Sequence, residues 1–231
     1  MRKANEKSRF LNFPVQLLSG FLTNKEYVLE NILDYAVYVK AQSLKSYSEL
    51  KNGKEALAYF KINGQDPQIT LDVGKLLYEL LPKKSPMVGL NTAIWLKYYK
   101  DEKTEFEDIS FLAFLALKSI LGRKTHCKVN NKYWLARMDG KPCSIENYNE
   151  LSPEIYKYST EYQTVKIKKA LEDSWGLTTY SFHTRGFYVS FELTLEELVY
   201  QAEKLKQSNK DREYQAHKKE AREKAYDRLK A

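Results

Sequence analysis

Apolar residues recur every three or four positions along most of this chain and alternate strictly only near residue 190. The clearest helical segment covers residues 159–175. Ser159 or Thr160 can cap its start by accepting a hydrogen bond from an early backbone N–H, and Gly176 suits the left-handed turn that ends a helix. At about 100° per residue, one face of this helix is suited to burial. That face consists of Thr164, Ile167, Leu171 and Trp175.

The opposite face of this helix is polar and carries two lysines. It consists of Tyr162, Lys166, Lys169 and Asp173, with Gln163 and Lys168 on its flanks. Lysine and glutamine side chains can contact guanine and adenine edges, and tyrosine often contacts phosphate. The same residues also suit an ordinary solvated helix face.

After Gly176 the period of the pattern changes from 3.6 to 2, which predicts a half-buried strand. Residues 177–182 supply an antiparallel neighbour, and the connection His183-Thr184-Arg185-Gly186 is short enough for a hairpin. We expect the hairpin to pack against a buried helix at residues 109–121. The side chains expected in this seam are Trp175, Phe187, Val189 and Phe191.

Further helical patterns fill most of the remaining chain, whereas Pro14 favours an irregular or extended segment at residues 10–18. We expect helices at residues 23–44, 55–62, 71–81, 88–99, 109–121, 130–137 and 152–158, with another from Thr194. Thr23, Thr70 and Asp108 are the expected caps of three of them, and Asn52-Gly53 marks an expected break. From Gln207 the apolar stripe ends, which predicts a solvated helix or a disordered tail.

A helix that leads directly into a hairpin with a basic tip resembles the recognition helix and wing of winged helix-turn-helix DNA-binding domains. The resemblance covers roughly residues 108–193 and rests on this pattern of elements. It implies that Tyr162, Gln163, Lys166 and Lys169 face the major groove. It also implies that His183 and Arg185 at the wing tip contact phosphates or the minor groove, where arginine is favoured if the groove is narrow.

The chain therefore predicts a mainly α fold with a small antiparallel β-hairpin. A helical N-terminal domain at residues 1–104 precedes a winged-helix-like domain at residues 105–206 and a charged helical or disordered tail at residues 207–231. A chain of 231 residues with 43% hydrophobic residues is long enough to build substantial cores.

Net charge and cysteine content indicate which kind of partner and which cellular compartment to expect. A net charge of +8 favours an anionic partner, because neutralising phosphates releases counterions. Two cysteines, Cys127 and Cys143, are too few for a structural zinc cluster even with His126 nearby. We expect free thiols in a reducing compartment, the cytoplasm, and a disulfide between them is the alternative. The longest apolar stretch, residues 109–121, is too short to span a bilayer, so no membrane association is expected.

Catalytic signatures are lacking. There is no phosphate-binding glycine loop, and His126, His183 and His217 form no recognised metal motif. We therefore expect no enzyme activity, no metal or other cofactor and no small-molecule substrate.

The leading hypothesis is a protein that binds duplex DNA, either a transcriptional regulator or a replication initiator of plasmid or phage type. Self-association into a homodimer stays open. The alternative is a helical protein–protein interaction module without nucleic-acid binding, in which the charged C-terminal helix is the contact element and the hairpin only closes the core.

Overall fold

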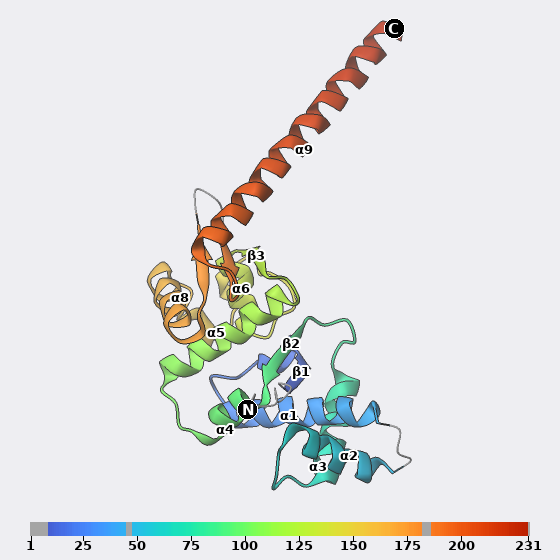
Figure 1. Cartoon of the computed structure of the whole chain (residues 1–231), viewed down its shortest axis with the longest axis vertical. Helices are drawn as coiled ribbons and strands as arrows, with labels where there is room; N and C mark the ends of the chain where they lie inside the picture. Colours follow the sequence, from blue (N-terminus) through green and yellow to red (C-terminus); the bar gives the residue numbers. More distant parts are fainter. Residues whose placement is uncertain (1–8, 45–47, 182–185, 231) are drawn as a thin grey trace, which may run out of the picture.

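The computed structural model describes residues 9–44, 48–181 and 186–230, and it confirms a mainly α fold with small antiparallel sheets (Figure 1). The first half of the chain contains β1 (Phe10–Pro14), a 3-10 turn (Val15–Leu18), α1 (Lys25–Gln42), α2 (Glu49–Phe60), α3 (Pro67–Leu80), β2 (Met87–Asn91) and α4 (Thr92–Lys100). The second half contains α5 (Glu105–Leu121), β3 (His126–Val129), α6 (Asn131–Met138), a 3-10 turn (Tyr148–Glu150), α7 (Pro153–Tyr156), α8 (Glu161–Trp175), β4 (Thr178–Tyr180), β5 (Phe187–Ser190) and α9 (Leu195–Lys230).

The single helix expected at residues 88–99 is wrong, because its first part is strand β2. Strand β2 pairs antiparallel with β1, and Leu11 lies opposite Leu90 with both side chains fully buried. Burial alternates along β2 as it should in a strand with one face on the core. The helix α4 starts only after Asn91, whose side chain accepts a hydrogen bond from the Ala93 N–H.

Two expected helix starts also differ from the structure. Asn24, not Thr23, caps α1 by accepting from the Tyr27 N–H. Asp66 caps α3, which begins at Pro67, a residue suited to the first turn. The reason is local in both cases, since an amide oxygen one residue after Thr23 and a carboxylate four residues before Thr70 accept from the free N–H groups at the helix starts.

Thr70, the cap expected for α3, lies inside the helix and is buried. Asn52-Gly53 is likewise no break, because both residues are buried within α2, which is capped by Ser48. A Cβ on Gly53 would lie 2.7 Å from Leu71 Cδ1, so the glycine permits close packing of α2 on α3. Close packing between helices therefore overrides the local turn signal.

Helix α1 and α3 also meet at a glycine. A Cβ on Gly74 would lie 2.2 Å from the Asp34 carbonyl oxygen and 2.7 Å from Tyr38 Cβ. The two helix backbones can approach this closely only because Gly74 has no side chain. Next to the crossing, the Asp34 carboxylate makes a hydrogen bond with the buried Thr70.

Helix α5 connects the two halves of the molecule. Phe111, at its centre, is fully buried and contacts the rings of Phe21 and Tyr98 from the first half at centroid distances of 5.8 and 3.8 Å. It also contacts Trp175 from the second half at 6.0 Å. One hydrophobic cluster thus contains residues from both halves. The division into three domains stays a prediction.

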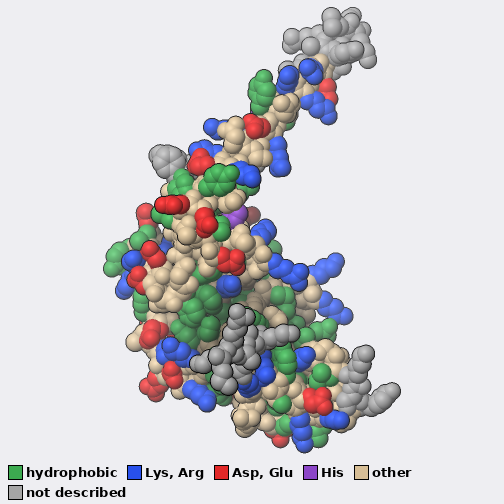
Figure 2. All heavy atoms as spheres, in the orientation of Figure 1, with side chains coloured by type: hydrophobic (Ala, Val, Ile, Leu, Met, Phe, Trp, Pro, Cys, Tyr) green, Lys and Arg blue, Asp and Glu red, His purple; other side chains and the backbone are tan. Residues whose placement is uncertain are grey.

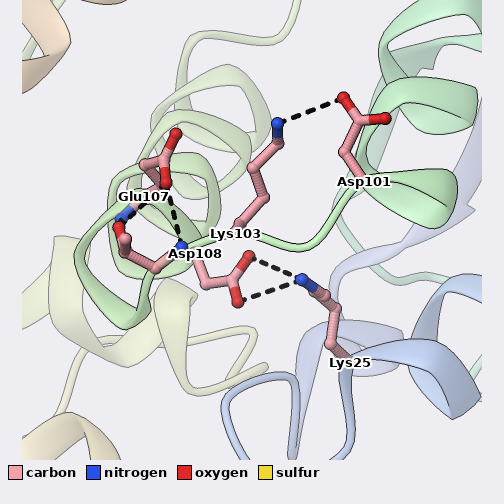
Figure 3. Close-up of polar contacts among 6 residues, drawn as sticks. Lys25, Asp101, Lys103, Glu107 and Asp108 are labelled. Atoms are coloured by element: carbon pink, nitrogen blue, oxygen red, sulfur yellow. Dashed lines mark hydrogen bonds and ion pairs between the residues drawn. The ribbon is translucent and has the colours of Figure 1, made fainter.

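The start of α5 shows a further correction, because Thr104, not Asp108, is its cap. Thr104 and Glu107 form a reciprocal capping box, and the Asp108 carboxylate instead pairs with Lys25 at 3.2 Å (Figure 3). Burial raises the pKa of Asp108, and the Lys25 ammonium opposes this rise. Asp108 therefore links α5 to the first turn of α1.

The second half contains a three-stranded antiparallel sheet with the order β3-β5-β4. Strand β3 was not expected from the sequence; its Cys127 lies opposite Val189 of β5. Gly186 has a positive φ (98°), and a Cβ there would lie 2.4 Å from the Val129 carbonyl oxygen. The hairpin is therefore held to β3 at the end nearest its tip.

The long last helix, α9, begins with a Thr194 capping box and leaves the body of the molecule (Figure 1). From Lys210 to Glu223 every side chain that the structure describes is exposed. Across the described ranges, no helix combines the length and apolarity needed to cross a membrane.

Candidate nucleic-acid interface

Helix α8 begins and ends where its sequence predicts. Thr160 accepts a hydrogen bond from the Gln163 N–H at 3.3 Å, and Gly176 takes a left-handed conformation with φ of 66°. Ile167 and Leu171 are fully buried, as expected for the inward face. Helix α8 is therefore anchored to the core and presents its other face to solvent.

The expected seam between the hairpin and α5 forms around Phe114 of α5. Trp175 stacks on Phe114 at 4.1 Å between ring centroids, and Phe191 meets the same ring edge-on at 5.2 Å. Val189 is fully buried. Phe187, however, packs edge-on against Trp134 of α6, at 5.9 Å. The hairpin thus rests on two helices, α5 and α6.

The outward face of α8 is exposed but carries charges of both signs. Tyr162 and Val165 are 73% and 58% exposed. Figure 2 shows basic and acidic side chains intermixed over the region where α8 lies in Figure 1. The Lys169 ammonium lies 3.2 Å from carboxylate oxygens of both Glu172 and Asp173. These hydrogen bonds and charges raise the pKa of Lys169.

Lys166 differs from Lys169 in its surroundings. Its ammonium lies 4.5 Å from the centroid of the Phe106 ring, at the start of α5, and pairs with no carboxylate among the described residues. Gln163 is half-buried on the flank of the same face. Of the two predicted lysines, Lys166 thus has the charge more available to a phosphate.

The other two residues predicted to contact DNA, His183 and Arg185, lie outside the described residues. The structure does describe the strands that lead to them. Tyr180 of β4 lies opposite Tyr188 of β5, with 6.5 Å between ring centroids, and the Tyr180 hydroxyl donates to Glu203 of α9 at 3.3 Å. Helix α9 therefore supports the hairpin on its outer side.

Lys168, seen in the sequence only as a flanking residue, lies at the junction of three elements. Its ammonium donates to the Asn131 side-chain oxygen at 3.3 Å and lies 3.6 Å from the centroid of the Phe187 ring. The Trp134 ring is 5.8 Å away. Desolvation by this burial lowers the pKa of Lys168 to about 8, and Glu161 partly opposes the shift.

The sequence did contain a signal for this position. Lys168 follows the buried Thr164 by four residues and precedes the buried Leu171 by three, so it borders the inward stripe. A lysine at that spacing must lie partly against the core or bend away from it. Its partners Asn131 and Phe187 could not be read from spacing, because they come from distant parts of the chain.

The described ranges contain no group of three or more His, Cys, Asp or Glu side chains placed to hold a metal ion. Burial raises the pKa of the Cys127 thiol to about 11, and the thiol form is a poor nucleophile. Cys143 is a free, exposed thiol.

In comparisons with protein-family models, curated proteins and solved structures, none matches this chain.

Proposed function

We propose that this protein binds duplex DNA through α8 and the β4–β5 hairpin, as a transcriptional regulator or a replication initiator of plasmid or phage type. The observation that carries the proposal is that, apart from the short helix α7 between α6 and α8, the elements follow in the order α5, β3, α6, α8, β4, β5, with the strands arranged β3-β5-β4. A winged helix-turn-helix domain has this order of elements, with α8 in the place of the recognition helix and the β4–β5 connection in the place of the wing.

Two further features support the proposal. The net charge of +8 favours phosphate contacts. The outward face of α8 is open, with Tyr162 and Lys166 four residues apart on it, while the inward face is anchored on α5. A helix fixed in this way can enter a major groove without rearranging the core.

The test is binding of duplex DNA, measured by fluorescence anisotropy at several salt concentrations. Wild-type protein should bind with an affinity that falls steeply as salt rises. The double variant Lys166→Ala, Lys169→Ala should weaken binding by roughly tenfold and reduce the salt slope by about one contact, because Lys169 is already paired with acidic residues. Its melting temperature should remain close to that of the wild type.

The matched control removes the same charge elsewhere. Lys54 on α2 and Lys75 on α3 are exposed, so Lys54→Ala, Lys75→Ala has the same net charge as the first variant. Equal losses of DNA affinity in the two variants would show that binding depends on the net charge of the protein and not on the face of α8. Wild-type protein without salt-dependent affinity for DNA would refute the proposal.

The second candidate is the helical protein–protein interaction module, and α9 is the feature that favours it. Tyr200 and Tyr214 are 65% and 64% exposed on this projecting helix, and Leu205 is 44% exposed. Sedimentation of the full chain and of a chain cut after Gln207 tests this function. A chain without DNA affinity that loses self-association on this truncation would favour the interaction module.

A further inference from the structure

Lys168 is a cation placed between three elements, α8, α6 and β5. It projects from α8 toward Asn131, the first residue of α6, and toward Phe187, the first residue of β5. Among the described residues no acidic side chain pairs with its ammonium, which is held by one neutral amide oxygen and two aromatic ring faces. Ring faces attract a cation, but they replace only part of its lost hydration.

The charged groups on the neighbouring elements do not supply the missing anion. On α6, Lys132 donates to the Glu146 backbone carbonyl and lies over Tyr148. On β3, Lys128 lies over Tyr188, the residue that follows Phe187 in β5. On α8 itself, Glu161 favours the charged form of Lys168 from a distance, and Glu172 is engaged by Lys169. The recorded contacts of the Lys168 ammonium are thus with a neutral amide oxygen and two aromatic rings.

The position of this cation coincides with the proposed DNA-binding surface. Phe187 follows the hairpin connection directly, so the ammonium lies where α8 meets the base of the hairpin. Lys168 is half-buried rather than enclosed, and its side chain therefore remains open to an anion from solvent. A phosphate of a duplex lying along α8 and the hairpin would provide that anion.

We infer that the Lys168 ammonium binds a backbone phosphate of the nucleic acid and is positioned for it by Asn131 and Phe187. This inference rests on the proposed function and adds a contact to the same surface. The ordinary structural role of such a lysine would be to fix α8 against α6 and β5 without contacting the ligand. The two roles differ in how binding responds to pH.

Phosphate contact links DNA affinity to the protonation of this amine. Its pKa of about 8 in the free protein means that the ammonium form is lost as pH rises above 8. A phosphate favours the ammonium form, so binding takes up a proton there, and affinity should fall by up to about tenfold per pH unit. Ordinary lysines, with a pKa near 10.4, stay charged over most of that range.

The experiment measures affinity for a fixed duplex between pH 6.5 and 9.5 at constant salt. Wild-type affinity should be constant at low pH and fall above pH 8. Lys168→Arg keeps its charge throughout, so its affinity should stay nearly level and exceed that of the wild type at pH 9.5. Lys168→Met, which keeps the apolar stem, should bind several-fold more weakly at pH 7 and show the same level profile.

Lys118→Met is the matched control, because the Lys118 ammonium also lies over an aromatic ring, that of Phe191 at 5.5 Å, but on α5. It should retain the wild-type affinity and pH profile, which would show that removing a lysine beside an aromatic ring does not by itself change DNA binding. Melting curves at each pH verify that every variant is folded. Lys168→Arg with the full wild-type pH dependence, or Lys168→Met with wild-type affinity, would overturn the inference while leaving the proposed function intact. Absence of any DNA binding would overturn both.

Discussion

Helices α3 and α8 are similar in length, 14 and 15 residues, and each leads to a strand, but they present different surfaces to solvent. The exposed face of α3 carries an aliphatic stripe, Ile69, Leu76 and Leu80 at 64%, 56% and 71% exposure, beside exposed charged residues such as Asp72 and Lys75. The exposed face of α8 is mixed, with Tyr162 and Val165 among charged residues. The exposed faces of two amphipathic helices can therefore suit different partners. The pattern of buried residues on the inward faces does not predict this difference.

Their attachments differ as well. Helix α3 meets α1 through backbone contact at Gly74, whereas α8 rests on the side chains of Ile167 and Leu171. A close contact between backbones is destabilised when a substitution adds atoms, because the helices must separate. A contact between buried side chains is destabilised when a substitution removes atoms, because a cavity remains. Substitutions on the two helices can test this difference.

The largest effect is expected on α8. Leu171→Ala removes a fully buried side chain and should lower the free energy of unfolding by about 2–5 kcal/mol. Urea denaturation measures this loss. Val165→Ala, on the exposed face of the same helix, is the control and should change stability by no more than about 0.5 kcal/mol. A loss below about 1 kcal/mol for Leu171→Ala would show that α8 is loosely attached.

On α3 the corresponding test adds an atom. Gly74→Ala places a Cβ 2.2 Å from the Asp34 carbonyl oxygen, so α1 and α3 must separate. The expected cost is about 1–3 kcal/mol, in spite of the higher helix propensity of alanine. Lys75→Ala, at the neighbouring exposed position, should be nearly neutral in the same urea measurement. A stabilised Gly74→Ala variant would contradict the close backbone contact.

A smaller effect concerns the carboxyl group beside this contact. Burial, with a contribution from Glu30, raises the pKa of Asp34 from 3.8 to about 7, although its hydrogen bond with Thr70 opposes the shift. Between these values the folded state holds the proton more tightly than the unfolded state. The resulting contribution to stability is complete below pH 4 and is lost as pH rises toward 7.

Asp34→Asn removes this titration. The variant should gain stability relative to the wild type as pH rises from 4 to 7, with no further change above that range. Melting temperatures across this range, with Asp72→Asn on the exposed side of α3 as control, measure the difference. Parallel curves for wild type and Asp34→Asn would mean that Asp34 titrates normally in the folded protein.

The smallest effect should come from the aliphatic stripe of α3. Leu76 is 56% exposed, so Leu76→Gln should change the free energy of unfolding by no more than about 0.5 kcal/mol. Leu71→Gln, on the buried face, should cost several times more in the same urea measurement. A loss above about 1 kcal/mol for Leu76→Gln would show that this stripe is covered in solution.

The sequence predicted those elements whose signals are local. Thr160, Gly176 and the spacing of Ile167 and Leu171 define α8 without reference to the rest of the chain. The strands β2 and β3 were missed because four- or five-residue strands depend on partners elsewhere, here β1 and β5. The helix break predicted at Gly53 was wrong for the same reason, because this glycine makes room for Leu71 of another helix.

For the candidate site the sequence placed Tyr162, Lys166 and Lys169 on the exposed side of α8, and the structure agrees. The ion pairs of Lys169 could have been anticipated, because Glu172 and Asp173 follow it by three and four residues. The environment of Lys168 could not, because it is assembled from three elements. DNA contact by these residues remains a prediction.

The projecting part of α9 also gives the molecule an uneven distribution of mass. The helix extends from residue 207 to 230 beyond the last apolar position of its stripe, roughly 36 Å at about 1.5 Å per residue. A rod of this length adds little volume but increases friction and the radius of gyration more than its mass suggests. The protein should therefore tumble anisotropically, with slower reorientation of the rod axis than of the axes across it.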